Sequence, residues 1–200
     1  MRVLLIGLGA IILMTSSALA QDQGAGDETC SVSGKDMSAY AALDYDAFNY
    51  GADGWRALAS RKCFYDAGAS IISWLVDHEG DLDGAQLRTE HYQAARNFAL
   101  ADRREIALLQ LRLAQDNTPK KLGAMNWNAY LDAFEAWLSE DAQGLRTSIA
   151  RLEKQPDGSD GRKPNLDAAR RFERCFTKTY IMIERDPACL PEPASTQGVR

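Results

Sequence analysis

Helical periodicity is the feature that most constrains the fold of this chain. From Met37 onward alanine is frequent, β-branched residues are sparse, and no stretch sustains the alternation of apolar and polar residues that marks a half-buried strand. Apolar residues instead recur at steps of three and four, which places them on one face of a helix. The pattern, with its short turns, predicts an all-α fold of antiparallel helix pairs, with helices over 48–61, 64–78, 85–101, 103–116, 126–139, 141–154 and 165–185.

The first twenty residues have the pattern of a secretory signal peptide. An arginine precedes a nearly unbroken apolar run over residues 3–14, and Ala18-Leu19-Ala20 follows as a small-x-small cleavage site. The run is shorter than the ~20 residues that cross a bilayer. We therefore predict cleavage between Ala20 and Gln21, and an exported protein, periplasmic or secreted, with no transmembrane segment in the mature chain.

Composition divides the remainder of the chain into three parts. Residues 21–43 are rich in Gly, Ser, Asp and Gln near their start and are interpreted as a flexible leader. Residues 44–186 carry the helical pattern and are long enough for one domain with a sizeable core. Residues 187–200 begin with several prolines and are interpreted as a disordered tail.

Four cysteines follow the predicted signal peptide, which suits two disulfides in an exported chain. Three connectivities are possible. We favour Cys30–Cys63, because the leader can reach the helix turn at Cys63. We pair Cys175 with Cys189, because the tail can fold back along the last helix, most easily if that helix ends early.

Net charge argues against one class of partner. The chain carries −5 at pH 7, with a sequence pI near 5.1. Affinity for a phosphate backbone comes from clustered Lys and Arg, so we expect no nucleic-acid partner. No Walker loop, glycine-rich dinucleotide motif or nucleophile elbow is present in the sequence, and we expect no cofactor.

The helical pattern repeats most clearly over residues 88–121. Small residues at two positions let antiparallel helices approach closely, large apolar residues fill the space beside them, and a proline ends the unit: Ala95, Phe98, Ala107, Leu111, Ala114 and Pro119. This unit resembles a tetratricopeptide repeat (TPR), here in an exported, bacterial-type protein. It departs from the family at His91 and Ala94, where larger apolar residues are usual.

Two further units extend the resemblance over residues 48–154. The earlier one uses Ala67, Ile71 and Trp74, and the later one includes Tyr130 and Phe134. Ala67 and Ala107 are 40 residues apart, more than the family period of ~34. The resemblance implies a solenoid of helix pairs closed by a C-terminal capping helix, although an ordinary α-hairpin bundle would bury the same Trp and Phe side chains.

The TPR resemblance also implies a function, by analogy of fold alone. Such repeats bind proteins or peptides in a concave groove, so we predict a non-enzymatic binding or assembly module. In this register Tyr92 and Arg96 face the partner groove and would contact the ligand. Trp55, Ala95 and Phe98 instead face the core. Replacing both groove residues with alanine would then abolish binding and leave the thermal midpoint nearly unchanged.

Two alternatives remain open at the level of sequence. Residues 79–90 have the spacing of an EF-hand calcium loop with Glu90 at its end, although Glu79 replaces the usual first Asp. The chain could otherwise be an accessory cell-envelope enzyme or an enzyme regulator. A hydrolase acting on glycans would use glutamates on helices, and the candidates are Glu90, Glu105 and Glu135.

Overall fold

The computed structural model describes Cys30 and residues 34–118, 126–159 and 161–190, apart from the side chains of residues 34–36. Within these residues the protein is all-helical, as predicted. The predicted signal peptide and cleavage site, most of the leader, Pro119 and the last ten residues lie outside the described part. The helices are α1 Gly34–Ala41, α2 Tyr45–Tyr50, α3 Trp55–Ser60, α4 Phe64–His78, α5 Gly84–Leu100, α6 Arg104–Leu113, α7 Trp127–Leu138, α8 Ala142–Glu153, α9 Leu166–Arg174 and α10 Tyr180–Arg185, with 3₁₀ turns at Glu79–Asp81 and Pro187–Cys189.

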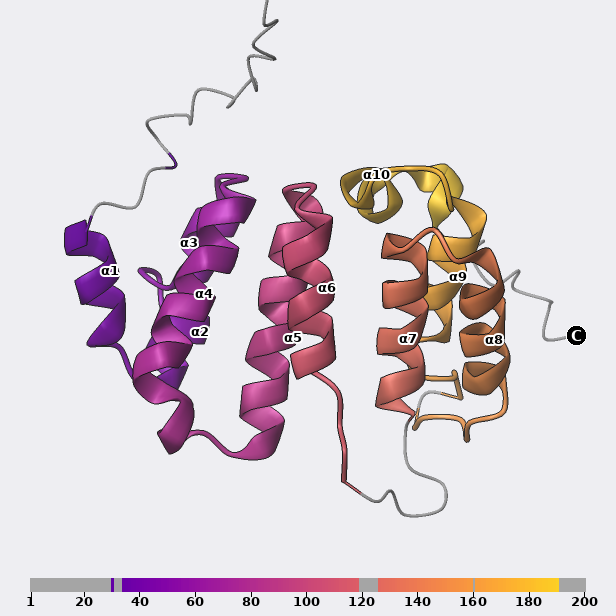
Figure 1. Cartoon of the computed structure of the whole chain (residues 1–200), viewed down its shortest axis with the longest axis horizontal. Coiled ribbons are helices and arrows are strands. Elements are labelled where there is room, and N and C mark those ends of the chain that lie inside the picture. Colours follow the sequence, from indigo (N-terminus) through magenta and orange to yellow (C-terminus); the bar gives the residue numbers. More distant parts are fainter. Residues whose placement is uncertain (1–29, 31–33, 119–125, 160, 191–200) are drawn as a thin grey trace, which may run out of the picture.

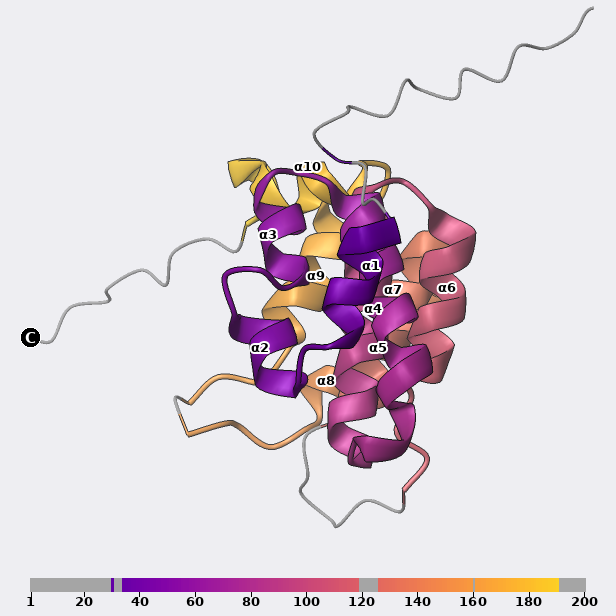
Figure 2. The same ribbon diagram turned by 90° about the vertical axis from the view of Figure 1, so that its left-hand side faces the viewer.

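The long helices pack as antiparallel neighbours in chain order. Helix α4 lies against α5, α5 against α6, and α7 against α8 (Figure 1). The short helices α1, α2 and α3 lie on the N-terminal side of this stack, where Figure 2 shows α1 in front of α4, and α2 and α3 to the left of α4 and α5. At the other end α9 packs on α7 and α8, while α10 lies across the top and also contacts α5. No helix in the described ranges has the length and apolar character needed to cross a membrane.

Three of the helix connections share one turn geometry. A residue with positive φ ends the first helix of each pair: Lys62 at 68°, Asp102 at 55° and Glu140 at 59°. The next residue donates its N–H to a carbonyl five residues back, which is the six-to-one bond of a Schellman motif. These bonds run from Cys63 to Leu58 (3.0 Å), from Arg103 to Phe98 (2.8 Å) and from Asp141 to Ala136 (2.8 Å).

The same turn makes the buried positions of the three pairs equivalent. The residues five, nine and twelve places after each positive-φ residue are all at most 6% exposed: Ala67, Ile71 and Trp74; Ala107, Leu111 and Ala114; Leu145, Ile149 and Leu152. The chain therefore repeats a helix hairpin, with turns 40 and 38 residues apart. The core prediction for Trp55, Ala95 and Phe98 is confirmed, since each is at most 3% exposed.

Two predicted helices are interrupted in the structure. The helix expected over 48–61 is divided into α2 and α3 because Gly51 and Gly54 lie between them. A Cβ at Gly51 would stand 2.3 Å from the carbonyl oxygen of Ala47, and one at Gly54 would stand 2.0 Å from that of Phe48. No side chain fits either backbone, so the glycines turn the chain. Helix α1 occupies part of the segment assigned to the flexible leader.

The last predicted helix, 165–185, is divided at Cys175, which ends α9. The chain then forms α10 and a 3₁₀ turn and returns to α9, where Cys189 pairs with Cys175 at a Cα–Cα distance of 5.7 Å. The other disulfide joins Cys30 to Cys63 at 5.2 Å. Both favoured pairings are present, and the early end of α9 is the condition under which the second was expected to form.

Ala107 offers a test of the paired-helix register. It is fully buried on α6, at a position equivalent in the other hairpins to Ala67 and Leu145. We expect Ala107→Leu to lower the free energy of unfolding by about 1–3 kcal/mol, because extra methylenes would overpack the core. Urea denaturation measures the change. Ala85→Leu, at an exposed position of α5, is the matched control. Equal urea midpoints for the two variants would contradict the predicted pairing of the helices.

Candidate functional site

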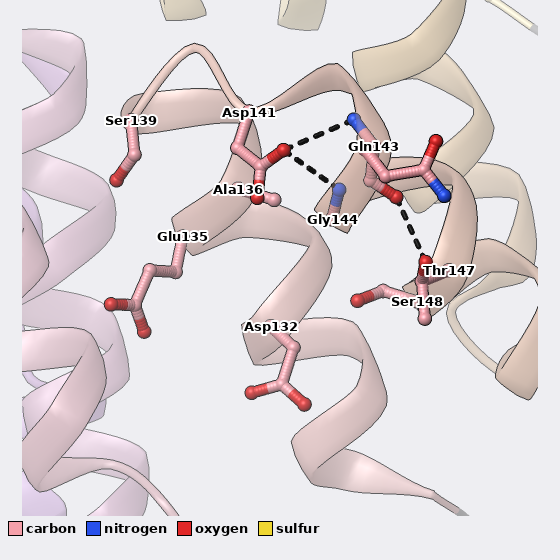
Figure 3. A pocket seen from close by; sticks show the side chains of 9 residues that line it. All are labelled: Asp132, Glu135, Ala136, Ser139, Asp141, Gln143, Gly144, Thr147 and Ser148. Carbon is pink, nitrogen blue, oxygen red and sulfur yellow. Dashed lines mark hydrogen bonds between the residues drawn. The ribbon is translucent and has the colours of Figure 1, made fainter.

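A hollow of about 480 Å³ lies between α7 and α8 on the surface of the stack (Figure 3). Its size falls in the range of small-ligand sites, ~300–1,000 Å³. Helix α7 contributes side chains at steps of three and four, so they share one face. Nine residues line the hollow: Asp132, Glu135, Ala136, Ser139, Asp141, Gln143, Gly144, Thr147 and Ser148.

The turn between the two helices fixes one wall of the hollow. Asp141 is the N-cap of α8, and its Oδ1 accepts hydrogen bonds from the backbone N–H groups of Gln143 (3.1 Å) and Gly144 (2.9 Å). Gly144 leaves room for this carboxylate, because a Cβ there would stand 2.3 Å from Oδ2 of Asp141 and the side chain of Asp141 would have to move. The glycine therefore lets the carboxylate lie over the start of α8.

Arginines from neighbouring helices neutralise two other carboxylates. Arg112 of α6 donates two hydrogen bonds to Oε1 of Glu135, at 3.0 and 3.1 Å. Arg151 of α8 donates to Oδ2 of Asp132 at 2.6 Å, and Gln115 donates to its Oδ1 at 3.0 Å. Oε2 of Glu135 and Oδ2 of Asp141 accept no hydrogen bond within the part of the chain that the structure describes.

Two hydroxyl groups of α8 complete the hollow. Thr147 is exposed and donates to the carbonyl oxygen of Gln143 at 2.9 Å. Ser148 is only 4% exposed, yet it lines the hollow, and Figure 3 shows its hydroxyl pointing from α8 toward α7. That hydroxyl makes no hydrogen bond with any described residue. The site thus offers acceptors of both carboxylate and hydroxyl type.

The two predicted groove residues lie elsewhere, where α5 meets the C-terminal helices. The hydroxyl groups of Tyr92 and Tyr130 are 2.8 Å apart, and the Tyr92 ring packs edge-on against Trp127 with centroids 5.1 Å apart. Arg96 donates from Nε to the Tyr180 hydroxyl at 3.2 Å, and its Nη2 lies 3.4 Å from Oε2 of Glu184. Contacts within the chain therefore occupy both side chains, and a ligand would have to displace α10 to use Arg96.

Glu90 is fully buried on α5 (0% exposed) beside α2 and α3. Neither of its carboxylate oxygens accepts a hydrogen bond of ordinary geometry from the described residues. Burial raises the pKa of Glu90 to about 7, against smaller effects of Asn49, Tyr45 and Arg56, which favour the ionised form. The same neighbourhood raises the pKa of Tyr45 to about 12, through burial and the nearby Glu90.

The structure does not support a calcium loop at residues 79–90. Oδ1 of Asp83 accepts hydrogen bonds from the N–H groups of Ala85 and Gln86, both at 2.8 Å, and Gln86 completes a capping box. Glu90, the expected terminal ligand, is enclosed in the core instead. Across the described ranges, no three His, Cys, Asp or Glu side chains are grouped so that they could hold a metal ion.

The three glutamates considered for catalysis occupy three different environments. Glu90 is enclosed beside α2 and α3, Glu105 is exposed in the first turn of α6, and Glu135 is paired with Arg112. Only Glu135 lines the hollow. The sequence pattern did not single out Asp132, Asp141 or Ser148, although a signal for the hollow exists in it. Residues 132, 135, 136 and 139 share one face of a predicted helix and mix acids with small residues.

Comparison of the chain with models of protein families, with curated proteins and with solved structures gave no match. A proposal of function therefore depends on the geometry of the chain and on the patterns of its sequence.

Proposed function

We propose that this protein is a non-enzymatic module that binds a protein or peptide outside the cytoplasm. The observation that carries the proposal is the hollow between α7 and α8. It is open to solvent and combines carboxylates, hydroxyl groups and an amide with the apolar Ala136. Mixed acceptors on rigid helices suit recognition of a partner's polar groups.

Two further features support the proposal. The chain is built from repeated helix hairpins, and the resemblance of residues 88–121 to a TPR unit favours protein binding by analogy of fold. The two disulfides favour a compartment outside the reducing cytoplasm. The predicted signal peptide agrees with export to the periplasm or the medium.

Site-specific photo-crosslinking in cells tests the proposal. A photoreactive residue replaces Thr147, at the hollow, and in a second variant Thr89, on α5. Both threonines are exposed, and both donate a hydrogen bond to the carbonyl oxygen four residues earlier, at 2.9 and 2.8 Å. We expect a discrete crosslinked protein partner from position 147 and none from position 89. The same adducts from both positions, or none from position 147, would contradict the proposal.

A further inference from the structure

We infer that the Cys30–Cys63 disulfide is a site of thiol exchange, which a dithiol reductant opens while the Cys175–Cys189 disulfide stays closed. The inference does not depend on the proposed binding function. A second hollow of the surface, of about 450 Å³, lies at the first disulfide. Both of its cysteines line this hollow, together with the end of α5, the turn that follows α5, and Ile181 of α10. We call it the disulfide hollow.

Access differs between the two disulfides. Cys30 is partly exposed where it lines the disulfide hollow, whereas its partner Cys63 is only 2% exposed. Cys175 and Cys189 are 5% and 0% exposed, so both residues of the second bond are buried. Exchange begins when a thiolate attacks one sulfur of a disulfide, and its rate depends on access to that sulfur. The hollow therefore makes the sulfur of Cys30 the point of attack.

The position of Cys63 favours its departure as a thiolate. Cys63 is the N-cap of the 15-residue helix α4, where backbone N–H groups and the helix dipole stabilise a negative charge. Arg61 and Lys62 precede it in the chain, and Lys62 lines the same hollow. Asp66 in the first turn of α4 acts against this effect, as one charge against the helix end and two cations. A thiolate that is stabilised in this way leaves faster in exchange.

The second disulfide has a different electrostatic setting. Cys175 is the C-cap of α9, where the helix dipole disfavours a negative charge. The nearby cation Lys178 forms an ion pair with Asp186. Burial also disfavours a thiolate at Cys175 and at Cys189. Access and charge therefore both protect this bond from exchange.

The exchange takes place in two balanced steps. A thiolate of the reductant attacks Sγ of Cys30, the disulfide bond breaks, and its electron pair leaves on Sγ of Cys63. The second thiolate of the reductant then attacks the reductant's own sulfur in the mixed disulfide and frees Cys30. Two electrons pass from the dithiol, which ends as a disulfide, to the two cysteines, which take up the two protons that the dithiol lost.

Contacts other than the disulfide hold the N-terminal helices on the stack. Nε1 of Trp74 donates to the carbonyl oxygen of Leu43 at 2.9 Å, and Nε2 of His78 lies 2.9 Å from the carbonyl oxygen of Ala41. These contacts join the chain after α1 to α4 whether or not the disulfide is closed. Exchange is therefore expected to open the disulfide and leave the helical stack folded.

The experiment is a timed reduction of the whole disulfide-bonded protein with dithiothreitol, followed by acid quenching, alkylation and peptide mapping. We expect thiols at Cys30 and Cys63 to appear about tenfold faster or more than thiols at Cys175 and Cys189, because access and thiolate stability both set the rate. The helical signal in circular dichroism should be unchanged while only the first bond is open. In urea the preference should shrink severalfold.

Four outcomes would overturn the inference. They are equal rates in the folded protein, faster opening of the second bond, a preference that urea leaves undiminished, and loss of the helical signal when the first bond opens. A brief reaction with the monothiol cysteamine tests the direction of attack. We expect the adduct on Cys30 and an alkylated thiol on Cys63, and an adduct mainly on Cys63 would contradict the assigned leaving group.

Ile181 and Met182 supply a matched pair of variants for the route through the disulfide hollow. They are neighbours on α10, but only Ile181 lines the hollow, and Met182 is 45% exposed. Ile181→Phe should slow opening of the first disulfide by about threefold or more, because the larger ring fills the route to the sulfur. Met182→Phe should leave the rate unchanged. Equal rates for the two variants, with equal urea midpoints, would contradict the route.

Lys62 and Lys154 supply a second pair, which tests the charge beside the leaving sulfur. Both are exposed lysines next to a helix end, and only Lys62 lines the disulfide hollow. Lys62→Gln should slow opening of the first disulfide by about two- to threefold, because one stabilising cation is lost. Lys154→Gln should have no effect. The same rate for both variants would contradict the role of Lys62.

Discussion

The stability of this protein is expected to fall as the pH rises from about 4.5 to about 7, and Glu90→Gln should remove that fall. Glu90 is fully buried, and burial raises the pKa of its carboxyl group from 4.5 to about 7 in the folded protein. The folded chain therefore holds a proton that the unfolded chain releases. Unfolding releases this proton between the two pKa values, so the favourable contribution is complete below pH 4.5 and lost above pH 7.

The pKa difference sets the size of the effect. At 1.36 kcal/mol per pKa unit, the shift corresponds to about 3 kcal/mol of folding free energy. Urea denaturation of the wild type and of Glu90→Gln at several pH values measures it. We expect the difference between the two unfolding free energies to change by about that amount between pH 4 and pH 8, in favour of the glutamine variant at high pH.

Glu105→Gln is the matched control for Glu90→Gln. Glu105 lies exposed in the first turn of α6, so its replacement removes the same formal charge without removing a buried carboxyl group. This variant should keep the pH dependence of the wild type. If Glu90→Gln also keeps that dependence, then the Glu90 carboxylate is solvated or hydrogen-bonded in solution.

Local patterns in the sequence predicted most of the helices, because their causes are local. The apolar periodicity predicts α4 with its observed ends, 64–78, and α5, α7 and α8 to within one residue. Buried alanines and large apolar residues at fixed offsets predicted the helix pairs. The disulfides could be predicted for a related reason, since the reach of the leader and of the tail restricts which cysteines meet.

The remaining differences depend on contacts between segments far apart in the chain. The sequence predicts Glu90 only as the end of a calcium loop or as a catalytic candidate, because nothing near it in sequence shows that α2 and α3 cover it. The break between those two helices depends on the close approach of Gly51 and Gly54 to backbone carbonyls. The hollow likewise needs α7 and α8 at their observed spacing before Asp141 and Ser148 lie in one site.

Tyr92 and Arg96 show most clearly how tertiary contacts change a prediction from sequence. The TPR register places both on the inner face of the first helix of a pair, where the family binds its ligands. In this chain α10 and α7 lie against that face and supply Tyr180, Glu184 and Tyr130. The C-terminal helices thus occupy the surface that the resemblance assigns to a ligand.

The double variant Tyr92→Ala with Arg96→Ala is therefore expected to be strongly destabilised. The change removes a partly buried ring that packs against Trp127 and Tyr130. It also leaves the buried hydroxyls of Tyr130 and Tyr180 without their present partners. Truncation of this partly buried aromatic side chain and the loss of hydrogen bonds to buried groups together suggest a loss of about 3–5 kcal/mol in unfolding free energy.

A second tyrosine–arginine pair provides the control for that variant. Arg103 lies over the ring of Tyr65 at 5.9 Å, much as Arg96 lies over Tyr92 at 6.0 Å, but Tyr65 is 48% exposed and Arg103 is exposed. Tyr65→Ala with Arg103→Ala should cost only about 1–2 kcal/mol, because it removes an exposed cation–π contact and one edge-on contact with Phe98. Thermal and urea unfolding of both double variants separates the two roles. Equal midpoints would mean that Tyr92 and Arg96 form an open surface in solution, as the resemblance implies. A large loss confined to the first variant would mean that they hold α5 against α7 and α10.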